Sequence, residues 1–347
     1  MKKILMSGNE AIAEGALQAG CSFYAGYPIT PQNELTAYMA NHMQERGGIF
    51  IQAEAELSAI NMVFGASAAG ARSMTSSSSP GISLKQEGIS YIAGARLPAV
   101  IVNIMRGGPG LGNIAPAQSD YFQATRSGGH GDYHCIVLAP STVQESFDLT
   151  VLAFNLADKY RAPALILGDG MLGQMMEPLI IRKDKQIKPV GKPWALTGCK
   201  GREANVVKSF YLKEGDLEKL NLKLQKTYKE IAAKEQLWEE TFLDDAKLVL
   251  VAYGSMSRIA KSALRLLRGK GKRVGLIRPI SLWPFPKKAF ASQKKKYLVV
   301  EMSYGQMLED VQLALCGKAK VGFLGRSGGG VPSEEEIILK VNKIYNE

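Results

Sequence analysis

A carboxylate at position 56 opens the stretch of the chain with the most unusual composition. Residues 54–71, EAELSAINMVFGASAAGA, have the pattern of one helix in which small side chains are mixed with large apolar ones. Almost no face is charged after Glu56, so we expect a helix buried nearly all round, with a close helix crossing or a subunit seam against its small residues. A carboxyl group at the buried mouth of such a helix is suited to proton exchange. The alternative is that Glu56 only complements the helix dipole.

A threonine enclosed by two prolines is the second candidate for chemistry. In the segment YPITP at 27–31, each proline fixes its own φ and favours an extended conformation for the residue before it. Thr30 is therefore expected to be rigid at the carboxyl end of a strand, where open α/β sheets bind ligands. Thr30 could equally be the N-cap of a helix at 31–46 that begins with Pro31, and the two interpretations are compatible.

Two further predicted strands end in polar groups. The strand at 73–76 runs into the hydroxyl-rich sequence TSSSSPG, which can form a polar nest for a ligand, or only a flexible turn. The apolar strand at 99–105 ends at Arg106, whose guanidinium could bind a carboxylate with two hydrogen bonds or form a structural salt bridge. The glycine run at 107–112 lacks the G-x-G-x-x-G spacing of a dinucleotide site, so we expect it to let the backbone pass close to a ligand.

A histidine between two glycines, His130, lies in a loop that cannot be a regular helix. It could contact a substrate, or it could cap the predicted strand at 135–139. The chain has three histidines and four widely separated cysteines without a CxxC pair. We therefore expect no metal ligand and no iron–sulfur cluster in this chain.

The overall composition limits the class of protein. A length of 347 residues favours two domains, and no apolar run is long enough to cross a membrane or to form a signal peptide, so we expect a cytoplasmic protein without membrane contact. The net charge of +11 comes from lysines concentrated at 183–234 and 287–296. They form either a solvated surface or a docking face for an acidic partner. Nucleic-acid binding is not expected, because no recognition motif accompanies the basic residues.

The order of the predicted elements defines the fold class. Strands and helices alternate through residues 1–179, which predicts an α/β domain with a parallel sheet covered by helices on both faces. Residues 180–247 are predicted to be a linker with one docking helix from about 216 to 241, and 248–347 a second, smaller α/β domain. The sequence Gly-Asp-Gly at 168–170 is similar to the magnesium–diphosphate motif of thiamine enzymes, but residues 190–204 lack the asparagine that such a motif needs. We therefore do not expect a metal there.

Several of these segments together resemble one family. YPITP, EAELSA at 54–59, TSSSSPG, NIMRGGPGLGN at 103–113, AQSDYFQATRSGGHGDY at 117–133 and VVEMSYGQM at 299–307 look like the α subunit of 2-oxoacid:ferredoxin oxidoreductases. The similarity extends over nearly the whole chain. It is strongest to the 2-oxoisovalerate type, with the 2-oxoglutarate type close behind.

The resemblance implies half of a thiamine diphosphate site. The first domain would be the pyrimidine-binding domain and the last a transketolase-C-terminal-like domain. A β subunit would hold the magnesium, the diphosphate and an iron–sulfur cluster. A γ subunit and a small ferredoxin-like subunit would complete an enzyme that converts a 2-oxoacid and coenzyme A to acyl-CoA and CO₂ and reduces ferredoxin.

The resemblance also assigns roles to individual residues. It implies that Glu56 shares a proton with the pyrimidine ring nitrogen, and that Thr30 and Arg106 bind the substrate carboxylate. His130 is kept as a further candidate for substrate binding. The expected cofactor contacts are Tyr27, Pro28, Ile29, Glu56, Ser77, Ser78 and Ser79, although the family often has a glycine where Ser79 stands. Two other classes stay open: a non-catalytic scaffold subunit, and a lone protein that binds NAD or FAD.

Overall fold

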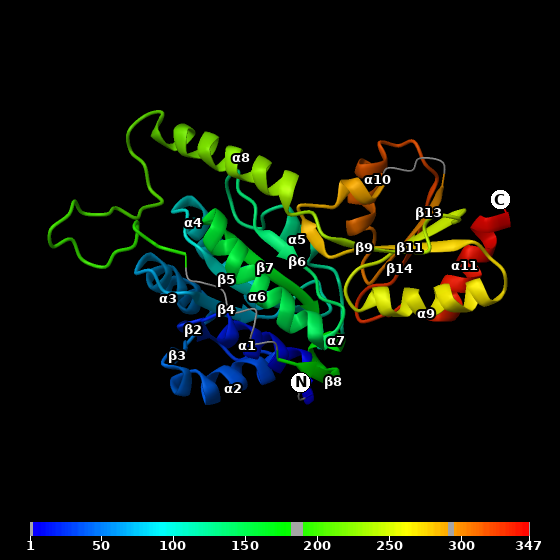
Figure 1. The fold of residues 1–347 in the computed structure, drawn as a ribbon, viewed down its shortest axis with the longest axis horizontal. Coiled ribbons are helices and arrows are strands. Elements are labelled where there is room, and N and C mark those ends of the chain that lie inside the picture. Colours follow the sequence, from blue (N-terminus) through cyan, green and yellow to red (C-terminus); the bar gives the residue numbers. More distant parts are fainter. Residues whose placement is uncertain (1–2, 182–189, 291–294, 347) are drawn as a thin grey trace.

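The computed structural model describes residues 3–181, 190–290 and 295–346, which form two large sheets and a small one (Figure 1). Parts of the two lysine-rich stretches, 182–189 and 291–294, lie outside the described residues. The large sheets have seven strands and five strands, and the N-terminal half of the chain builds most of the seven-stranded one.

The seven-stranded sheet has the order β12-β6-β7-β5-β4-β2-β3. Its strands are β2 (Phe23–Gly26), β3 (Ile49–Gln52), β4 (Ser73–Ser77), β5 (Ala99–Met105), β6 (Ile136–Leu138), β7 (Pro163–Asp169) and β12 (Ser281–Trp283). All neighbours are parallel except β12 and β6. The central strands β5 and β7 are buried at every residue, as expected for a parallel sheet covered on both faces. The predicted fold class is confirmed.

Helices connect these strands in the predicted alternation. They are α1 (Gly8–Gln18), α2 (Asn33–His42), η1 (Gln44–Arg46), α3 (Glu56–Ala68), α4 (Ser79–Gly94), α5 (Tyr121–Thr125), α6 (Val143–Tyr160) and α7 (Gly170–Gln174). Helix α1 packs on α6, and α3 packs on α4. Before α1, β1 (Lys3–Ser7) pairs antiparallel with β8 (Met176–Ile180) as a separate two-stranded sheet.

Two helix starts depend on local hydrogen bonds. At α1 the capping box is present, because the Ser7 hydroxyl accepts from the Glu10 N–H and the Glu10 carboxylate accepts from the Ser7 N–H. At α2 the predicted cap is wrong: the N-cap is Gln32, and Thr30 lies two residues further out. The Gln32 N–H instead closes a turn onto the carbonyl of Ile29, at 3.0 Å, so the helix begins only at Asn33.

The five-stranded sheet has the order β14-β13-β10-β11-β9. It contains β9 (Trp238–Thr241), β10 (Leu248–Val251), β11 (Val274–Pro279), β13 (Lys296–Glu301) and β14 (Val321–Gly325), with β9 antiparallel to β11. Helices α9 (Met256–Gly269), α10 (Gln306–Leu315) and α11 (Glu334–Asn346) and the short η3 (Lys287–Phe290) accompany it. The structural alternation agrees with the predicted α/β character of this part.

The predicted helix from 216 to 241 is too long. Helix α8 (Asp216–Lys234) ends seven residues earlier, and its N-cap is Gly215. The segment after it becomes strand β9, because pairing with the free edge of β11 satisfies its backbone hydrogen bonds. Helix α8 lies along the first sheet's side of the molecule (Figure 1), where the Tyr228 ring meets the rings of His134 and Trp283 edge-on.

The second part of the chain contributes one strand to the first sheet. Strand β12 leaves the second part and pairs with β6 at the edge of the seven-stranded sheet. Asp169, in the Gly-Asp-Gly sequence, caps α7 by accepting from the N–H groups of Met171 and Leu172, and it also accepts from the Ser255 hydroxyl. The carboxylate of Asp169 therefore joins the two sheets. The boundaries at 179 and 247 stay a proposal.

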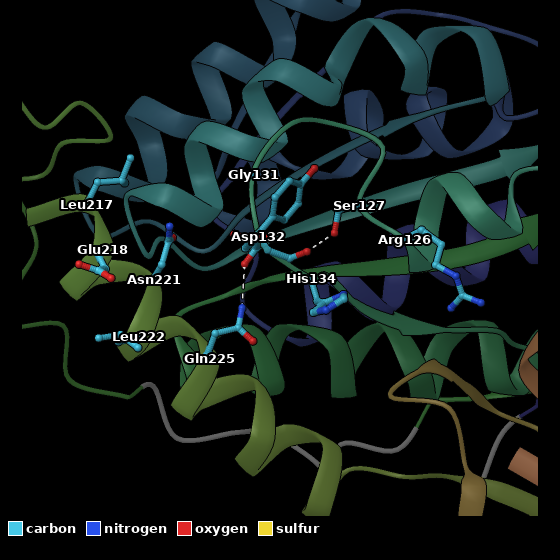
Figure 2. Close-up of a pocket in the computed structure, with 11 residues that line it drawn as sticks. Arg126, Ser127, Gly131, Asp132, His134, Leu217, Glu218, Asn221, Leu222 and Gln225 are labelled. Carbon is cyan, nitrogen blue, oxygen red and sulfur yellow. Dashed lines mark hydrogen bonds between the residues drawn. The ribbon is translucent and has the colours of Figure 1, made fainter. Parts of the chain in front are cut away.

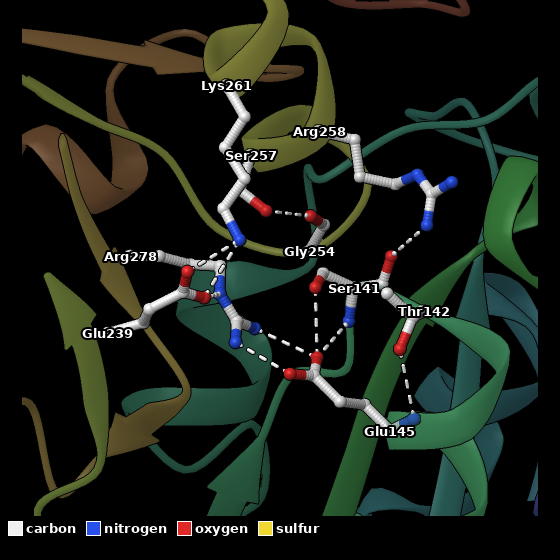
Figure 3. A network of polar contacts seen from close by, with 9 residues as sticks. All are labelled: Ser141, Thr142, Glu145, Glu239, Gly254, Ser257, Arg258, Lys261 and Arg278. Carbon is white, nitrogen blue, oxygen red and sulfur yellow. Dashed lines mark hydrogen bonds and ion pairs between the residues drawn. The ribbon is translucent and has the colours of Figure 1, made fainter. Parts of the chain in front are cut away.

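An ion-pair network also bridges the two sheets (Figure 3). Arg278 on β11 donates two hydrogen bonds to the Glu145 carboxylate on α6, at 2.6 and 2.9 Å, and a third to Glu239 on β9, at 2.8 Å. Lys261 on α9 also contacts Glu239. Because Arg278 is almost completely buried, this network fixes the five-stranded sheet against the first domain.

Candidate functional site

The candidate site lies at one edge of the seven-stranded sheet, where four neighbouring parallel strands end. The register pairs Gly26 of β2 with Gln52 of β3, and Ser77 of β4 with Asn103 of β5. Strands β2 and β4 are themselves parallel neighbours. The residues that follow the four strands therefore meet at the same edge. The structure brings the YPITP segment, Glu56, the serine run and Arg106 to this edge, as the sequence predicted.

Glu56 is the first residue of α3, and its side chain is buried, with the residue only 6% exposed. Space for its carboxyl group depends on Gly81 in the first turn of α4. A Cβ atom on Gly81 would lie 2.4 Å from Glu56 Oε1 and 2.1 Å from Ser77 Oγ. The carboxyl of Glu56 and the hydroxyl of Ser77 thus occupy the place where another residue would have its side chain.

A buried lysine, Lys85, is a member of this site that the sequence reasoning missed. Its Nζ donates to the main-chain oxygen of Glu56 at 3.2 Å, and the residue is 0% exposed. Burial lowers the pKa of Lys85 to about 8, although the nearby charge of Glu56 acts in the opposite direction. A lysine one turn after Gly81 was an available signal, since residues four apart share one helix face.

The rest of α3 differs from the prediction of burial all round. One face of the helix is exposed in this chain, with Leu57 45% and Met62 37% accessible. Gly65, on the same exposed side, has no atom within 4 Å of the position where a Cβ would lie. The alternative in that prediction, a subunit seam, would cover this face, because the partner of an apolar helix need not belong to the same chain. The seam stays a prediction.

Arg106 and Thr30 lie next to each other. Arg106 is 7% exposed, and its Nη1 donates to the Thr30 carbonyl at 2.9 Å, while Nη2 donates to the Leu111 carbonyl at 3.0 Å. Its buried Nε has no partner. A guanidinium carries five N–H donors, so this arginine is fixed in place and still has donors available for a carboxylate.

The serine run at 76–79 contains two hydrogen-bonded hydroxyls, of Ser76 and Ser79, and two hydroxyls without partners. The Ser76 hydroxyl donates to Gln32 Oε1 at 2.6 Å. The Ser79 hydroxyl donates to Asp120 at 2.6 Å and accepts from the Arg106 N–H at 3.0 Å. The hydroxyls of Ser77 and Ser78 are buried without a hydrogen-bond partner. Since buried polar groups are normally paired, these two hydroxyls fit a site that a polar ligand completes.

Asp120 is a second site residue that the sequence reasoning did not single out. It accepts from Ser79 and, at 2.9 Å, from the Asn103 amide, and burial raises its pKa despite these hydrogen bonds. It lies inside the segment AQSDYFQATRSGGHGDY. The carboxyl of Asp120 therefore fixes the N-terminus of α4 to the end of β5, next to Arg106.

The glycine run after Arg106 folds back on itself. Gly112 has a φ of +65°, and a Cβ there would lie 1.7 Å from the Gly107 carbonyl oxygen. The Gly107 N–H donates to the Ala115 carbonyl, and the Asn113 side chain donates to the Gly328 carbonyl. The close approach that these glycines permit is thus between two parts of the backbone, and it holds the loop against the C-terminal part of the chain.

His130 lies apart from Arg106. Its carbonyl accepts from the Ser90 hydroxyl at 2.7 Å, and its ring meets that of Tyr91 edge-on at 6.2 Å. Ser90 is eleven residues after Ser79 on α4, about 16 Å along the helix axis. The structure therefore does not bring His130 together with the other predicted substrate residues, and its substrate contact stays a prediction.

A cavity of about 710 Å³ lies beside this histidine, between α8 and the 126–134 loop (Figure 2). The Gln225 amide on α8 donates to the Asp132 carbonyl across it. A neighbouring cavity of about 160 Å³ contains His130 and Tyr91 in its wall. Both cavities are separated along α4 from the strand-end edge, so they are not the site described above.

Other parts of the segment at 117–133 connect the two sheets. The Gln118 side chain donates to the Tyr253 carbonyl and accepts from the Met302 N–H, both at 3.0 Å. The Tyr121 hydroxyl donates to Asp310 at 2.6 Å, and Arg126 pairs with the same carboxylate. The main role of this segment is therefore structural, because its side chains bind the two parts of the molecule together.

The described residues contain no helix long and apolar enough to cross a membrane, and no cluster of three or more histidine, cysteine or acidic side chains that could hold a metal ion. Cys21 and Cys135 are buried thiols whose pKa burial raises to about 12. Cys199 and Cys316 are exposed.

Comparison with protein families defines the class to which this fold and site belong. Residues 14–238 match the family described as pyruvate flavodoxin/ferredoxin oxidoreductase, thiamine-diphosphate-binding, and residues 246–337 match the core domain II of pyruvate:ferredoxin oxidoreductase. The chain belongs to this family. The resemblance predicted from the sequence is confirmed, and the chain is a subunit of a thiamine diphosphate-dependent 2-oxoacid:ferredoxin oxidoreductase.

Individual relatives cover nearly the whole chain. The ketoisovalerate oxidoreductase subunit VorB of Methanothermobacter thermautotrophicus is 48% identical over 346 residues, which are 99% of this chain and 98% of the relative. The 2-oxoglutarate synthase subunit KorA of Methanocaldococcus jannaschii is 38% identical over 97% of this chain and 98% of its own length.

Solved structures have the same fold. The 2-oxoglutarate:ferredoxin oxidoreductase of Magnetococcus marinus, solved with 2-oxoglutarate, coenzyme A and succinyl-CoA bound, superposes with a TM-score of 0.85 at 28% identity. The match covers 98% of this chain and 65% of that one. A split-gene transketolase superposes with a TM-score of 0.61 at 14% identity over 97% of both chains, which shows a shared fold alone.

Proposed function

We propose that this chain is the α subunit that holds the pyrimidine end of thiamine diphosphate in a site shared with a partner. The observation that carries the proposal is the buried carboxyl of Glu56 beside the unpartnered hydroxyls of Ser77 and Ser78, at the strand-end edge that also contains Arg106. A polar heterocycle that accepts and donates hydrogen bonds fits this set of groups. When bound, the cofactor supplies the carbanion chemistry that 2-oxoacid decarboxylation needs.

Each residue at the edge has a separate task in this proposal. Glu56 exchanges a proton with the ring nitrogen, which its burial and its fixed position on α3 allow. Ser77 and Ser78 donate to or accept from polar atoms of the ring. The segment Tyr27, Pro28 and Ile29, in which Ile29 is half-buried and the other two residues are exposed, contributes the opposite wall of the cofactor site. Arg106, fixed against the Thr30 carbonyl, binds the substrate carboxylate with its remaining donors, and Thr30 adds its hydroxyl.

A β subunit completes the site in our proposal. The exposed apolar face of α3, with Leu57 and Met62, begins at Glu56 and provides a surface that a partner can cover. Asp169 is engaged by α7 and Ser255, so we assign magnesium and the diphosphate to the β subunit. We assign the iron–sulfur clusters to partner chains as well, together with a γ subunit and a small ferredoxin-like subunit, and we place the complex in the cytoplasm.

The proposed substrate is 2-oxoisovalerate, which is oxidised with coenzyme A to a branched acyl-CoA and CO₂ while ferredoxin is reduced. The support is the 48% identity to subunits named for ketoisovalerate, against 38% to subunits named for 2-oxoglutarate. The second candidate is 2-oxoglutarate. Purified complex is assayed for ferredoxin reduction with 2-oxoisovalerate, 2-oxoglutarate and pyruvate. A higher kcat/KM for 2-oxoglutarate than for 2-oxoisovalerate would replace the first substrate by the second.

The catalytic assignment is tested by Glu56→Gln in the complete complex. We expect ferredoxin reduction to fall about 10²- to 10⁴-fold, because a general acid–base contribution of that size is lost. The matched control is Glu54→Gln, an exposed carboxylate two residues earlier that contacts only Ser58 among the described side chains. It should retain full activity. Unchanged activity of Glu56→Gln would refute the proton-exchange role and favour the scaffold class.

A further inference from the structure

The face of α4 that lies against α3 consists of Gly81, Lys85 and Gly88, which are spaced to share one side of a helix. Gly81 leaves room for the Glu56 carboxyl, as described above. A Cβ on Gly88 would lie 2.5 Å from Ile60, one turn after Glu56 on α3. At both ends of this face, side chains of α3 therefore pack directly against the backbone of α4. Lys85 is the one long side chain between the two glycines.

The environment of Lys85 is unusual for a lysine. A lysine is almost never fully buried without a charged partner, because desolvation of its ammonium is costly. The Nζ of Lys85 donates to the main-chain oxygen of Glu56, and the carboxylate on the same residue is its charged neighbour. Both groups that contact the ammonium belong to Glu56, a buried residue. Among the described acidic residues, Glu56 is therefore the one that holds the ammonium at the start of α3.

We propose that Lys85 is the positioning residue of this site: its ammonium fixes the first turn of α3 and so holds the Glu56 carboxyl toward the cofactor. The inference rests on the proposed function of Glu56. It adds a residue that touches neither substrate nor cofactor and acts through the residue that does. The ammonium must stay protonated to attract the carboxylate, so the geometry of Glu56 depends on pH.

The charged groups around Lys85 determine the direction of this dependence. Glu56 faces it from α3, whereas β5 contributes no ionisable side chain. Asp120 is bound to Ser79 at the beginning of α4, and Asp169 on β7 is bound to Ser255 and the backbone of α7. On α4 itself, Glu87 is exposed and accepts from Tyr91. Burial brings the pKa of Lys85 down to about 8, so we expect the ammonium to be lost as the pH rises through that value.

The test uses the complete complex with Lys85→Met and Lys85→Arg. Methionine keeps the length of the side chain and removes the charge, and we expect kcat to fall about 10²-fold, the cost of a small misplacement of a reacting group. Arginine stays charged at every accessible pH. We therefore expect the alkaline limb of the wild-type kcat profile, near pH 8, to move upward in Lys85→Arg and to vanish in Lys85→Met. Lys223→Met, an exposed change on α8, should leave the profile unaltered.

A second measurement does not depend on turnover. Amide hydrogen exchange of the peptide that contains residues 54–68 is followed by mass spectrometry between pH 6.5 and 9.5, corrected for the intrinsic pH dependence of exchange. In the wild-type complex, protection of the first turn should fall above pH 8. In Lys85→Met it should be low at every pH, and in Lys85→Arg it should be constant. A purely structural lysine would lower protection in the methionine variant without any pH dependence in the wild type.

The outcomes separate this inference from the proposed function. The role of Lys85 would be overturned if Lys85→Met had the wild-type kcat and an unshifted alkaline limb. If Glu56→Gln were inactive in the same experiments, the proposed function would still stand. Full activity of both variants would refute the proposed function itself. If Lys85→Met does not assemble, Lys85→Arg decides the question, because an alkaline limb at the wild-type pH in that variant contradicts the inference.

Discussion

Replacement of Arg278 by methionine should weaken the connection between the two sheets more than any ordinary surface change. The Arg278 side chain is 3% exposed, and its partners Glu145 and Glu239 are 27% and 36% exposed. Removal of one partner of a buried ion pair costs about 3–5 kcal/mol. Here both carboxylates reach water and keep other donors, Glu145 from Ser141 and Glu239 from Lys261. We therefore expect a loss in unfolding free energy of about 2–3 kcal/mol.

The assay is urea unfolding of the purified protein followed by tryptophan fluorescence. The third tryptophan, Trp194, is first replaced by phenylalanine in every protein of this series. Trp238 is in β9 of the five-stranded sheet and Trp283 is in β12 of the seven-stranded sheet, so a further phenylalanine substitution at either one leaves a single reporter in the other sheet. Because Arg278 joins the sheets, we expect the transitions of the two reporters to separate in Arg278→Met, and the one in the five-stranded sheet to occur at lower urea.

The matched control is Arg258→Met, which removes another arginine at the same junction. Arg258 pairs with Glu177 at 2.7 Å and donates to the Ser141 carbonyl, but its side chain is 35% exposed, so its loss should cost no more than about 1 kcal/mol. If the two variants lose the same free energy and their reporters still unfold together, then burial of Arg278 does not have the role derived from the structure.

Two further outcomes are expected. In Gly81→Ala the new Cβ would collide with the Glu56 carboxyl and the Ser77 hydroxyl. The affinity of the complex for thiamine diphosphate, measured by titration calorimetry, should therefore fall at least about tenfold, the equivalent of about 1.4 kcal/mol. An unaltered affinity would place the cofactor elsewhere. Burial lowers the pKa of His134, so the unfolded chain binds this proton more readily and stability should fall as the pH drops below about 6.5. The His134 ring stacks on Trp283 with 4.4 Å between the ring centroids, and a phenylalanine at position 134 can keep this stacking. His134→Phe should therefore reduce the dependence of the urea midpoint on pH. An equal dependence on pH in the wild type and the variant would contradict this prediction.

The parts of the site that the sequence predicted are those that directly follow strands. Four site residues each lie at or after the end of a predicted strand: Thr30, Glu56, Ser77 and Arg106. The carboxyl ends of parallel strands necessarily meet at one edge of the sheet. Knowledge of the strand order was not needed for that conclusion. The fold class followed in the same way, from the alternation of strands and helices.

The residues that the sequence did not predict depend on long-range pairing. Lys85 lies in a helix where a lysine normally indicates a solvated face, and only the packing of α4 on α3 reveals its burial. Strands β9 and β12 are short, and each forms because an open sheet edge lies next to it in space. His130 was placed near the substrate because glycines flank it, but glycines fix local conformation and not the distance to another loop.

Helix α3 combines the two properties that a shared active site needs. Its first residue is buried by α4 within the chain, while the face that carries Leu57, Met62 and Gly65 is left open. This face also carries the exposed Asn61. Its small residue, Gly65, allows another backbone to approach closely, and burial of its apolar side chains would stabilise an assembly by about 25 cal/mol for each Å² removed from water. The same helix therefore connects subunit assembly with the position of Glu56. Under the proposed function, a partner that covers this face would also order Glu56, and cofactor affinity and subunit affinity would then rise together by thermodynamic linkage.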